Sequence, residues 1–128
     1  MSTFVVIGVG VRNSDAICNR ANSIDNADMF IHQVCFWLKP GSPDSAKEQL
    51  IADARKYLGN IPTVRQLWVG PPAISPREVV DNSYQVGLLV TLDDSAGHDV
   101  YQEHPQHLEF IARNKAHWEK VRVIDFVG

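Results

Sequence analysis

The chain has 128 residues, of which 45% are hydrophobic and 21% charged, and its net charge of −3 gives a pI near 5.9. This size and composition fit one globular domain that can bury about two-thirds of its unfolded surface. Binding to nucleic acid demands clustered Lys and Arg, so the acidic balance and the scattered basic residues argue against that class of partner.

The first 28 residues are predicted to form an extension. Residues 4–11 are rich in Val and Ile and suit an extra strand, whereas residues 12–28 show no apolar period. No basic residue precedes the apolar run 4–11 and two glycines interrupt it, so it is a poor signal peptide, and it is too short to cross a membrane. Cys18 and Cys35 have no CxxC or Cys/His spacing, so we expect a reduced, cytoplasmic protein without a membrane partner.

A well-patterned domain is predicted from residue 29 to residue 128. Residues 30–38 form a strand that is apolar on both faces, with His32, Val34 and Phe36 on the side predicted to face the helices. A helix follows over 44–58, then a strand over 64–69, a loop over 71–83 and a strand over 84–92. A helix runs to Glu103, another begins at Pro105, and a strand over about 121–127 closes the domain.

The second of these late helices is predicted to turn one apolar side toward the core. The residues assigned to that side are Leu108, Ile111, Ala112 and Lys115. His98 and His117 are predicted to be solvated.

The order of these elements predicts an α+β fold. Strand, helix, strand, strand, helix, strand is the ferredoxin-like βαββαβ arrangement, a four-stranded antiparallel sheet with its helices on one face. Because the strands are apolar on both faces, the other face needs a cover, and a second copy of the chain is the simplest one. The residues predicted to form this homodimer interface are Ile31, Cys35, Trp37, Leu89, Ile124 and Phe126.

Residues 101–107 hold a phenol and two imidazoles around a proline. An imidazole, with a pKa of about 6.5, can give and take protons near neutral pH, so a proton-transfer site is one interpretation. The structural alternative is that His104 caps the helix whose first residue is Pro105. Glu103 lies on a different helix face from His104 and His107, and no third ligand is evident, so we predict no metal site there.

The chain resembles the stress-responsive A/B barrel (Dabb) family over about residues 29–127. The features that carry the resemblance are residues 29–40, Ile61-Pro62, Trp68-Val-Gly70, residues 84–92, residues 101–107 and residues 123–126. The resemblance implies a dimeric α+β barrel. In polyketide-cyclising members, His107 would match a general base, Tyr101 an assisting group and His32 a further pocket residue. Val86 stands where those enzymes have another histidine. His104, Val86 and Phe36 are predicted to line the same pocket.

Two classes of function remain open. The first is a stress-associated homodimer that binds a small aromatic or polyketide-like ligand without catalysis. The second is a cofactor-independent lyase, cyclase or isomerase, in which His107 removes a proton, Tyr101 orients the reaction and His32 polarises a carbonyl oxygen. A cofactor-free monooxygenase is a further alternative, and none of these needs a cofactor. A cavity of roughly 300 Å³ or more around the three side chains would favour a ligand site.

Overall fold

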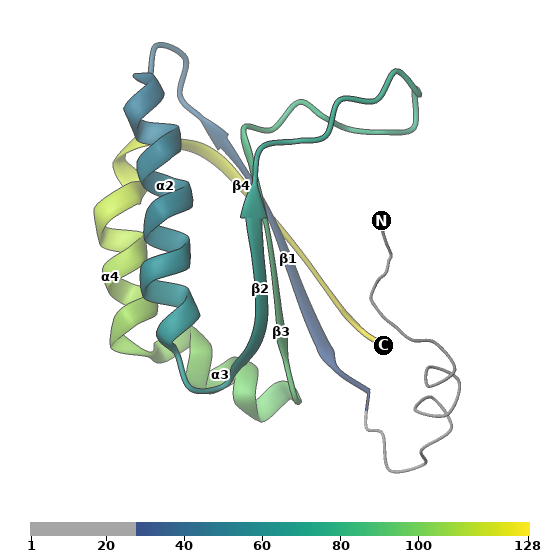
Figure 1. The fold of residues 1–128 in the computed structure, drawn as a ribbon, viewed down its shortest axis with the longest axis vertical. Helices are drawn as coiled ribbons and strands as arrows, with labels where there is room; N and C mark the ends of the chain where they lie inside the picture. Colours follow the sequence, from purple (N-terminus) through teal and green to yellow (C-terminus); the bar gives the residue numbers. More distant parts are fainter. Residues whose placement is uncertain (1–27) are drawn as a thin grey trace.

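A computed structural model describes residues 28–128 (Figure 1). The predicted strand over 4–11 therefore lies outside the described residues. The helices and strands occur in the predicted order, which confirms the βαββαβ arrangement. They are β1 (Phe30–Leu38), α2 (Asp44–Tyr57), β2 (Val64–Gly70), β3 (Val86–Leu92), α3 (Ser95–Glu103), α4 (Pro105–Asn114) and β4 (Trp118–Val127), with 3-10 turns at Leu58–Asn60 and Lys115–His117.

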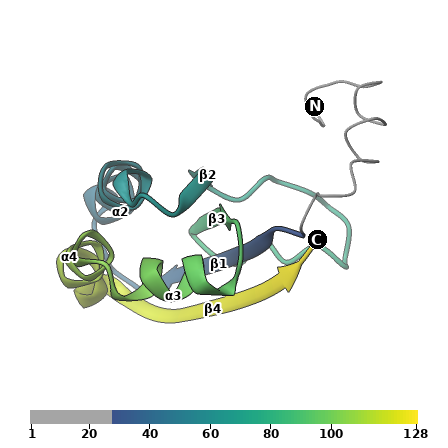
Figure 2. The same cartoon turned by 90° about the horizontal axis from the view of Figure 1, so that it is seen from below.

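The four strands form one antiparallel sheet in the order β2-β3-β1-β4, which confirms the ferredoxin-like fold. β1 is an inner strand, and its His32 lies opposite Val90 of β3 and Asp125 of β4. The three helices cover one face of this sheet, as the view in Figure 2 shows. β2 and β4 are the two edges, so the sheet of one chain does not close into a barrel by itself.

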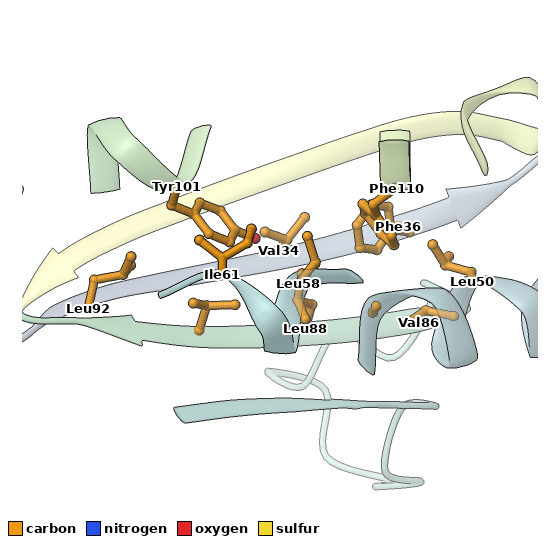
Figure 3. Close-up of a cluster of buried hydrophobic side chains, with 12 residues drawn as sticks. Val34, Phe36, Leu50, Leu58, Ile61, Val86, Leu88, Leu92, Tyr101 and Phe110 are labelled. Atoms are coloured by element: carbon orange, nitrogen blue, oxygen red, sulfur yellow. The ribbon is translucent and has the colours of Figure 1, made fainter. Parts of the chain in front are cut away.

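The core lies between this sheet face and the helices (Figure 3). Tyr101 enters it from α3 with only 1% of its surface exposed, and its hydroxyl points toward Val34 (Figure 3). Burying one such large apolar side chain contributes about 1.5–3 kcal/mol to stability. The buried core residues are Val34, Phe36, Leu50, Ala54, Leu58, Ile61, Val86, Leu88, Val90, Leu92, Tyr101 and Phe110.

A break separates α3 from α4 at His104 and Pro105. His104 has an extended backbone, and its Nδ1 accepts a hydrogen bond of 3.0 Å from the backbone N–H of Gln106, which confirms the predicted helix cap. Pro105 is well suited to the first helical position, because its missing N–H would have no partner there. The break directs Tyr101 and His107 toward the same space from two different helices.

A buried polar group ties α4 to α2. The Asp53 carboxylate, on α2, accepts hydrogen bonds from Arg113 Nε at 2.8 Å and from Asn114 Nδ2 at 3.0 Å. Asp53 and Asn114 are both buried, so these bonds satisfy groups that have no access to water. The position of α4, and of the His107 side chain that it carries, is thereby linked to the rest of the core.

The inward side of α4 differs from the prediction. Phe110 and Asn114 are buried and His107 and Ile111 are half-buried, whereas Leu108, Ala112 and Lys115 are exposed. The true spacing, 107, 110, 111 and 114, is that of one helix face, but it includes two polar residues. The prediction was wrong because it assigned the inward side mainly by hydrophobicity, and Asn114 is satisfied by its bonds to Asp53 and to the Phe110 carbonyl.

Two strand limits also differ from those predicted. β3 begins at Val86, because Tyr84 leaves the strand and its ring lies over Gly87. A Cβ atom at residue 87 would come within 3.2 Å of Tyr84 Cε2, so a larger residue there would require the ring to shift. β4 begins at Trp118 and is longer than predicted. Residues 71–85 contain no helix or strand and project on the side of the sheet away from the helices (Figure 1). Trp37 anchors this loop by a hydrogen bond of 3.0 Å from its Nε1 to Ser83 Oγ.

The sheet face opposite the helices is open in the single chain. The register places all the predicted interface residues on it: Ile31, Cys35, Trp37, Leu89, Ile124 and Phe126. Trp68 also belongs to this face, since it pairs with Leu89, and the sequence reasoning missed it. Phe126 is 50% exposed and Trp68 55% exposed. Among the residues 28–128 no helix has the length and hydrophobicity needed to cross a membrane.

Candidate functional site

Three side chains predicted to form a site come from three elements and meet between the helices and the sheet. His32 lies on β1, Tyr101 on α3 and His107 on α4. The His32 and Tyr101 ring centroids are 5.5 Å apart, and those of Tyr101 and His107 are 4.7 Å apart. The alternation of β1 directs His32 to the helix-covered face together with Val34 and Phe36. The geometry therefore brings the three residues together, with Tyr101 between the two imidazoles.

A carboxylate that the sequence reasoning missed is bonded to His32. His32 Nδ1 lies 2.7 Å from Asp125 Oδ1, within hydrogen-bond distance, on the neighbouring strand β4. A carboxylate in this position fixes the ring orientation and holds the proton on Nδ1, which leaves Nε2 as the acceptor. The available signal was the alternation of β4, which places Asp125 on the same face as Val121 and Val123, but the pairing with His32 depends on the strand register.

His98 also lies next to this group, contrary to the prediction that it is solvated. It is half-buried, stacks on Phe30 with 4.3 Å between the ring centroids, and lies 4.9 Å from the His32 ring. Its Nε2 is 3.0 Å from the Gln102 amide nitrogen. The reason for the difference is that α3 crosses the sheet near the start of β1, where Phe30 offers an aromatic surface.

Burial sets the protonation of the site. Desolvation lowers the pKa of His32 below 6.5, although the bonded Asp125 carboxylate opposes this change. Desolvation also lowers the pKa of His107, and the Gln102 backbone opposes it in part. Burial raises the pKa of Tyr101 far above its usual range. At neutral pH both imidazoles are therefore neutral, so each can accept a proton, while the phenol keeps its own.

A cavity of about 190 Å³ lies among these side chains. His32, Tyr101, Gln102 and His107 supply its polar wall, and the rest is apolar: Val34, Phe36, Leu88, Phe110, Ile111, Trp118, Val121 and Val123. Val121 and Val123 of β4 remain 40% and 48% exposed, so the cavity opens along the inner face of this edge strand. The volume is smaller than the roughly 300 Å³ expected of a drug-sized ligand site.

Of the other residues predicted to line the pocket, one lines the cavity and two do not. Phe36 lines the cavity, whereas Val86 is fully buried in the core beyond it and His104 is occupied as a helix cap. Among residues 28–128, His107 Nδ1 is buried without a hydrogen-bond partner. A buried polar atom of this kind costs about 1–3 kcal/mol unless something pairs with it. A ligand that carries a hydroxyl or carbonyl group would supply that partner.

Comparison with known proteins places the chain among characterised folds. The family model of the stress responsive A/B barrel domain matches residues 30–128. A Dabb family protein with a ferredoxin-like fold from Mesorhizobium loti is 30% identical with a TM-score of 0.65, and the match covers 79% of this chain and 97% of that one. No curated protein matches the chain significantly.

Two further solved structures show the same fold at lower identity. A dimeric ferredoxin-like protein of unknown function from Thermobifida fusca is 20% identical with a TM-score of 0.67, covering 80% of this chain and 92% of that one. A hydroxynitrile lyase from Passiflora edulis is 18% identical with a TM-score of 0.68, covering 80% of this chain and 94% of the enzyme.

Proposed function

The chain belongs to the stress responsive A/B barrel domain family, and from this premise we propose that it is a homodimer that binds a small, mostly apolar molecule and transfers a proton on it. One observation carries the proposal: His32, Tyr101 and His107 surround a single cavity whose other walls, apart from Gln102, are apolar. A few converging polar groups in an apolar space are typical of small-molecule sites. The proposed reaction class is a cofactor-independent lyase or isomerase.

The open sheet face supports the dimer. A hollow of about 510 Å³ on it is lined by residues that include Cys35, Trp68, Tyr84 and Leu89, so side chains of a second copy have a place to pack. Two of these residues, Cys35 and Leu89, belong to the predicted interface. The Thermobifida fusca relative is described as dimeric, which agrees with this arrangement.

The volume of the cavity sets the size of the ligand. A cavity of about 150 Å³ in another protein accommodates benzene. With about 190 Å³, this site accommodates one aromatic ring, or a branched chain of similar size, with one small polar group. The ring packs against Phe36, Phe110 and Trp118, and the polar group faces the imidazoles. Ligands with two rings are expected not to fit.

The roles of the polar residues follow from their positions. His107 removes a proton from a hydroxyl group, or from a carbon next to a carbonyl group, and returns it at the end of the reaction. The Tyr101 hydroxyl donates a hydrogen bond to the oxygen on which charge develops. His32, whose Nδ1–H is held by Asp125, offers Nε2 as an acceptor for a hydroxyl group of the ligand. The hydroxynitrile lyase relative is an enzyme of the lyase class on this fold, which supports the class but not a substrate.

A two-stage experiment tests the proposal. Thermal-shift and NMR titrations with one-ring aromatic aldehydes, ketones and alcohols are expected to show binding that His107→Gln weakens. His117→Gln, outside the cavity, is the matched control. Deuterium exchange at the carbon next to the carbonyl group then measures proton transfer on the bound ligands that have a C–H there, such as aryl methyl ketones and arylacetaldehydes. Equal binding by both variants would remove His107 from the site. Binding without any exchange would refute proton transfer from carbon and leave only the ligand-binding part of the proposal.

A further inference from the structure

His32, His98 and Asp125 form a second constellation at the end of the cavity nearest the start of β1. They come from β1, α3 and β4, and each offers one ligand atom such that the three atoms lie within 4.8 Å of one another. These residues are far apart in the sequence, and the strand register together with the crossing of α3 brings them together. We propose that His32, His98 and Asp125 bind a divalent transition metal ion such as Zn²⁺.

The distances suit such an ion after a small adjustment. Nitrogen and oxygen ligands lie about 2.0–2.2 Å from Zn²⁺, so neighbouring ligand atoms in a tetrahedral site are about 3.5 Å apart. The His32 and Asp125 atoms, now 2.7 Å apart across a hydrogen bond, would separate by less than 1 Å when the ion replaces the shared proton. The three ligand atoms now lie within 4.8 Å of one another, so the His98 ring moves toward the other two when the ion binds.

The chemistry of the three donors selects the kind of ion. Two imidazoles and one carboxylate favour Zn²⁺, Co²⁺ or Fe²⁺, whereas Mg²⁺ and Ca²⁺ prefer sites built of oxygen ligands. Three protein ligands leave a fourth position for water or for a ligand atom, as in catalytic rather than structural zinc sites. Asp125 has 34% of its side chain exposed, so an ion from solvent can reach the site.

Neighbouring groups support the ligands in the way that metal sites usually require. Phe30 stacks on the His98 ring and restricts its plane, and Gln102 contacts His98 Nε2 and can orient the ring. Tyr101 packs edge-on against His32. The metal site shares His32 with the proposed proton-transfer site but extends away from His107. It does not depend on the proposed reaction, since an ion can bind whether or not the cavity holds an organic ligand.

The test is a direct binding measurement on the full chain, purified without an affinity tag and stripped with a chelator. Isothermal titration with Zn²⁺ is expected to show one equivalent bound per chain, while Mg²⁺ gives no heat of binding. Co²⁺ is expected to give the visible absorption of a four-coordinate site without thiolate charge-transfer bands, which excludes binding through Cys35. His98→Ala should weaken Zn²⁺ affinity by at least about 10-fold, the cost of losing even an outer-sphere contact in known sites.

Matched variants keep the outcome interpretable. Asp125→Asn preserves the size of the side chain and should also weaken Zn²⁺ binding, whereas His117→Ala should leave it unchanged. Far-UV circular dichroism of each variant verifies its fold. The proposal is overturned if the wild-type chain binds no Zn²⁺, or if His98→Ala binds it as tightly as the wild type does. Neither result bears on the binding of aromatic ligands by His107, which is measured without metal.

Discussion

Replacement of Tyr101 by Phe tests whether the phenol serves the site or the fold. The side chain is 1% exposed and its hydroxyl points into apolar surroundings near Val34 (Figure 3). Among residues 28–128 this hydroxyl makes no hydrogen bond, yet it lines the cavity. Tyr101→Phe removes only that oxygen. The ring and its contacts with His32 and His107 stay in place.

The expected change in the free energy of unfolding follows from desolvation. A buried hydroxyl without a partner costs about 1–3 kcal/mol, and its removal would restore that amount. Water in the adjacent cavity of about 190 Å³ can satisfy part of the hydroxyl's hydrogen bonding, so we expect a smaller gain, up to about 1 kcal/mol. In a domain of this size such a gain raises Tm by up to about 4–8 °C. The same variant should lose affinity for one-ring carbonyl ligands.

Urea unfolding at one fixed protein concentration measures the effect, since the stability of a dimer depends on concentration. Tyr57→Phe, outside the cavity, is the control, and it should change stability by less than about 0.5 kcal/mol and leave ligand binding unaltered. A loss of more than about 1 kcal/mol in Tyr101→Phe would show that the hydroxyl has a structural partner, and would refute the reasoning.

The other predictions concern pH, the core and the dimer. Burial lowers the pKa of His107 below its unfolded value of 6.5, so the unfolded chain binds a proton first and the stability of the fold decreases as pH drops below 6.5. In urea titrations at several pH values, His107→Gln should weaken this pH dependence of stability. An unchanged dependence would contradict the prediction. Asn114→Ala removes one donor to the buried Asp53 carboxylate and should cost about 1–3 kcal/mol, which chemical denaturation measures; a loss below about 0.5 kcal/mol would mean that this bond is not important. Trp68→Asp should shift the protein toward monomer in sedimentation experiments, whereas Val100→Asp, 50% exposed on α3, should not, and equal behaviour of the two would argue against the open face as the interface.

The local order of hydrophobic and polar residues was sufficient to predict the helices and strands, but not every side chain that faces the core. The alternation in residues 30–38 predicts β1 with the bounds observed, because each residue of a strand reports its own face. α4 was predicted with the wrong inward residues, since Asn114 is buried only because Asp53, 61 residues earlier, accepts its hydrogen bond. The pattern of hydrophobic residues does not indicate that Asn114 has a hydrogen-bond partner on another helix.

The candidate site likewise contains residues that could be predicted from the sequence and residues that could not. Tyr101 and His107 could be proposed from residue type, and the family resemblance together with the strand face added His32. Asp125 and His98 could not, because their closeness to His32 depends on which strands pair and on where α3 crosses them. His104 was assigned to the pocket for its chemistry, although the break before Pro105 uses its ring to cap α4. The closeness of His104 to His107 in the sequence was misleading, and the closeness of Asp125 and His98 to His32 in space could not be seen in the sequence.

β1 has a consequence for how this protein can evolve. Its odd-numbered residues from Ile31 to Trp37 face the open side, and its even-numbered residues, among them His32 and Phe36, face the cavity. Inserting or deleting a single residue in this strand would exchange the two sets and remove the catalytic candidate and the contact surface in one event. We therefore expect length changes to be rejected in β1 and to accumulate in residues 71–85, where a change of length alters neither set.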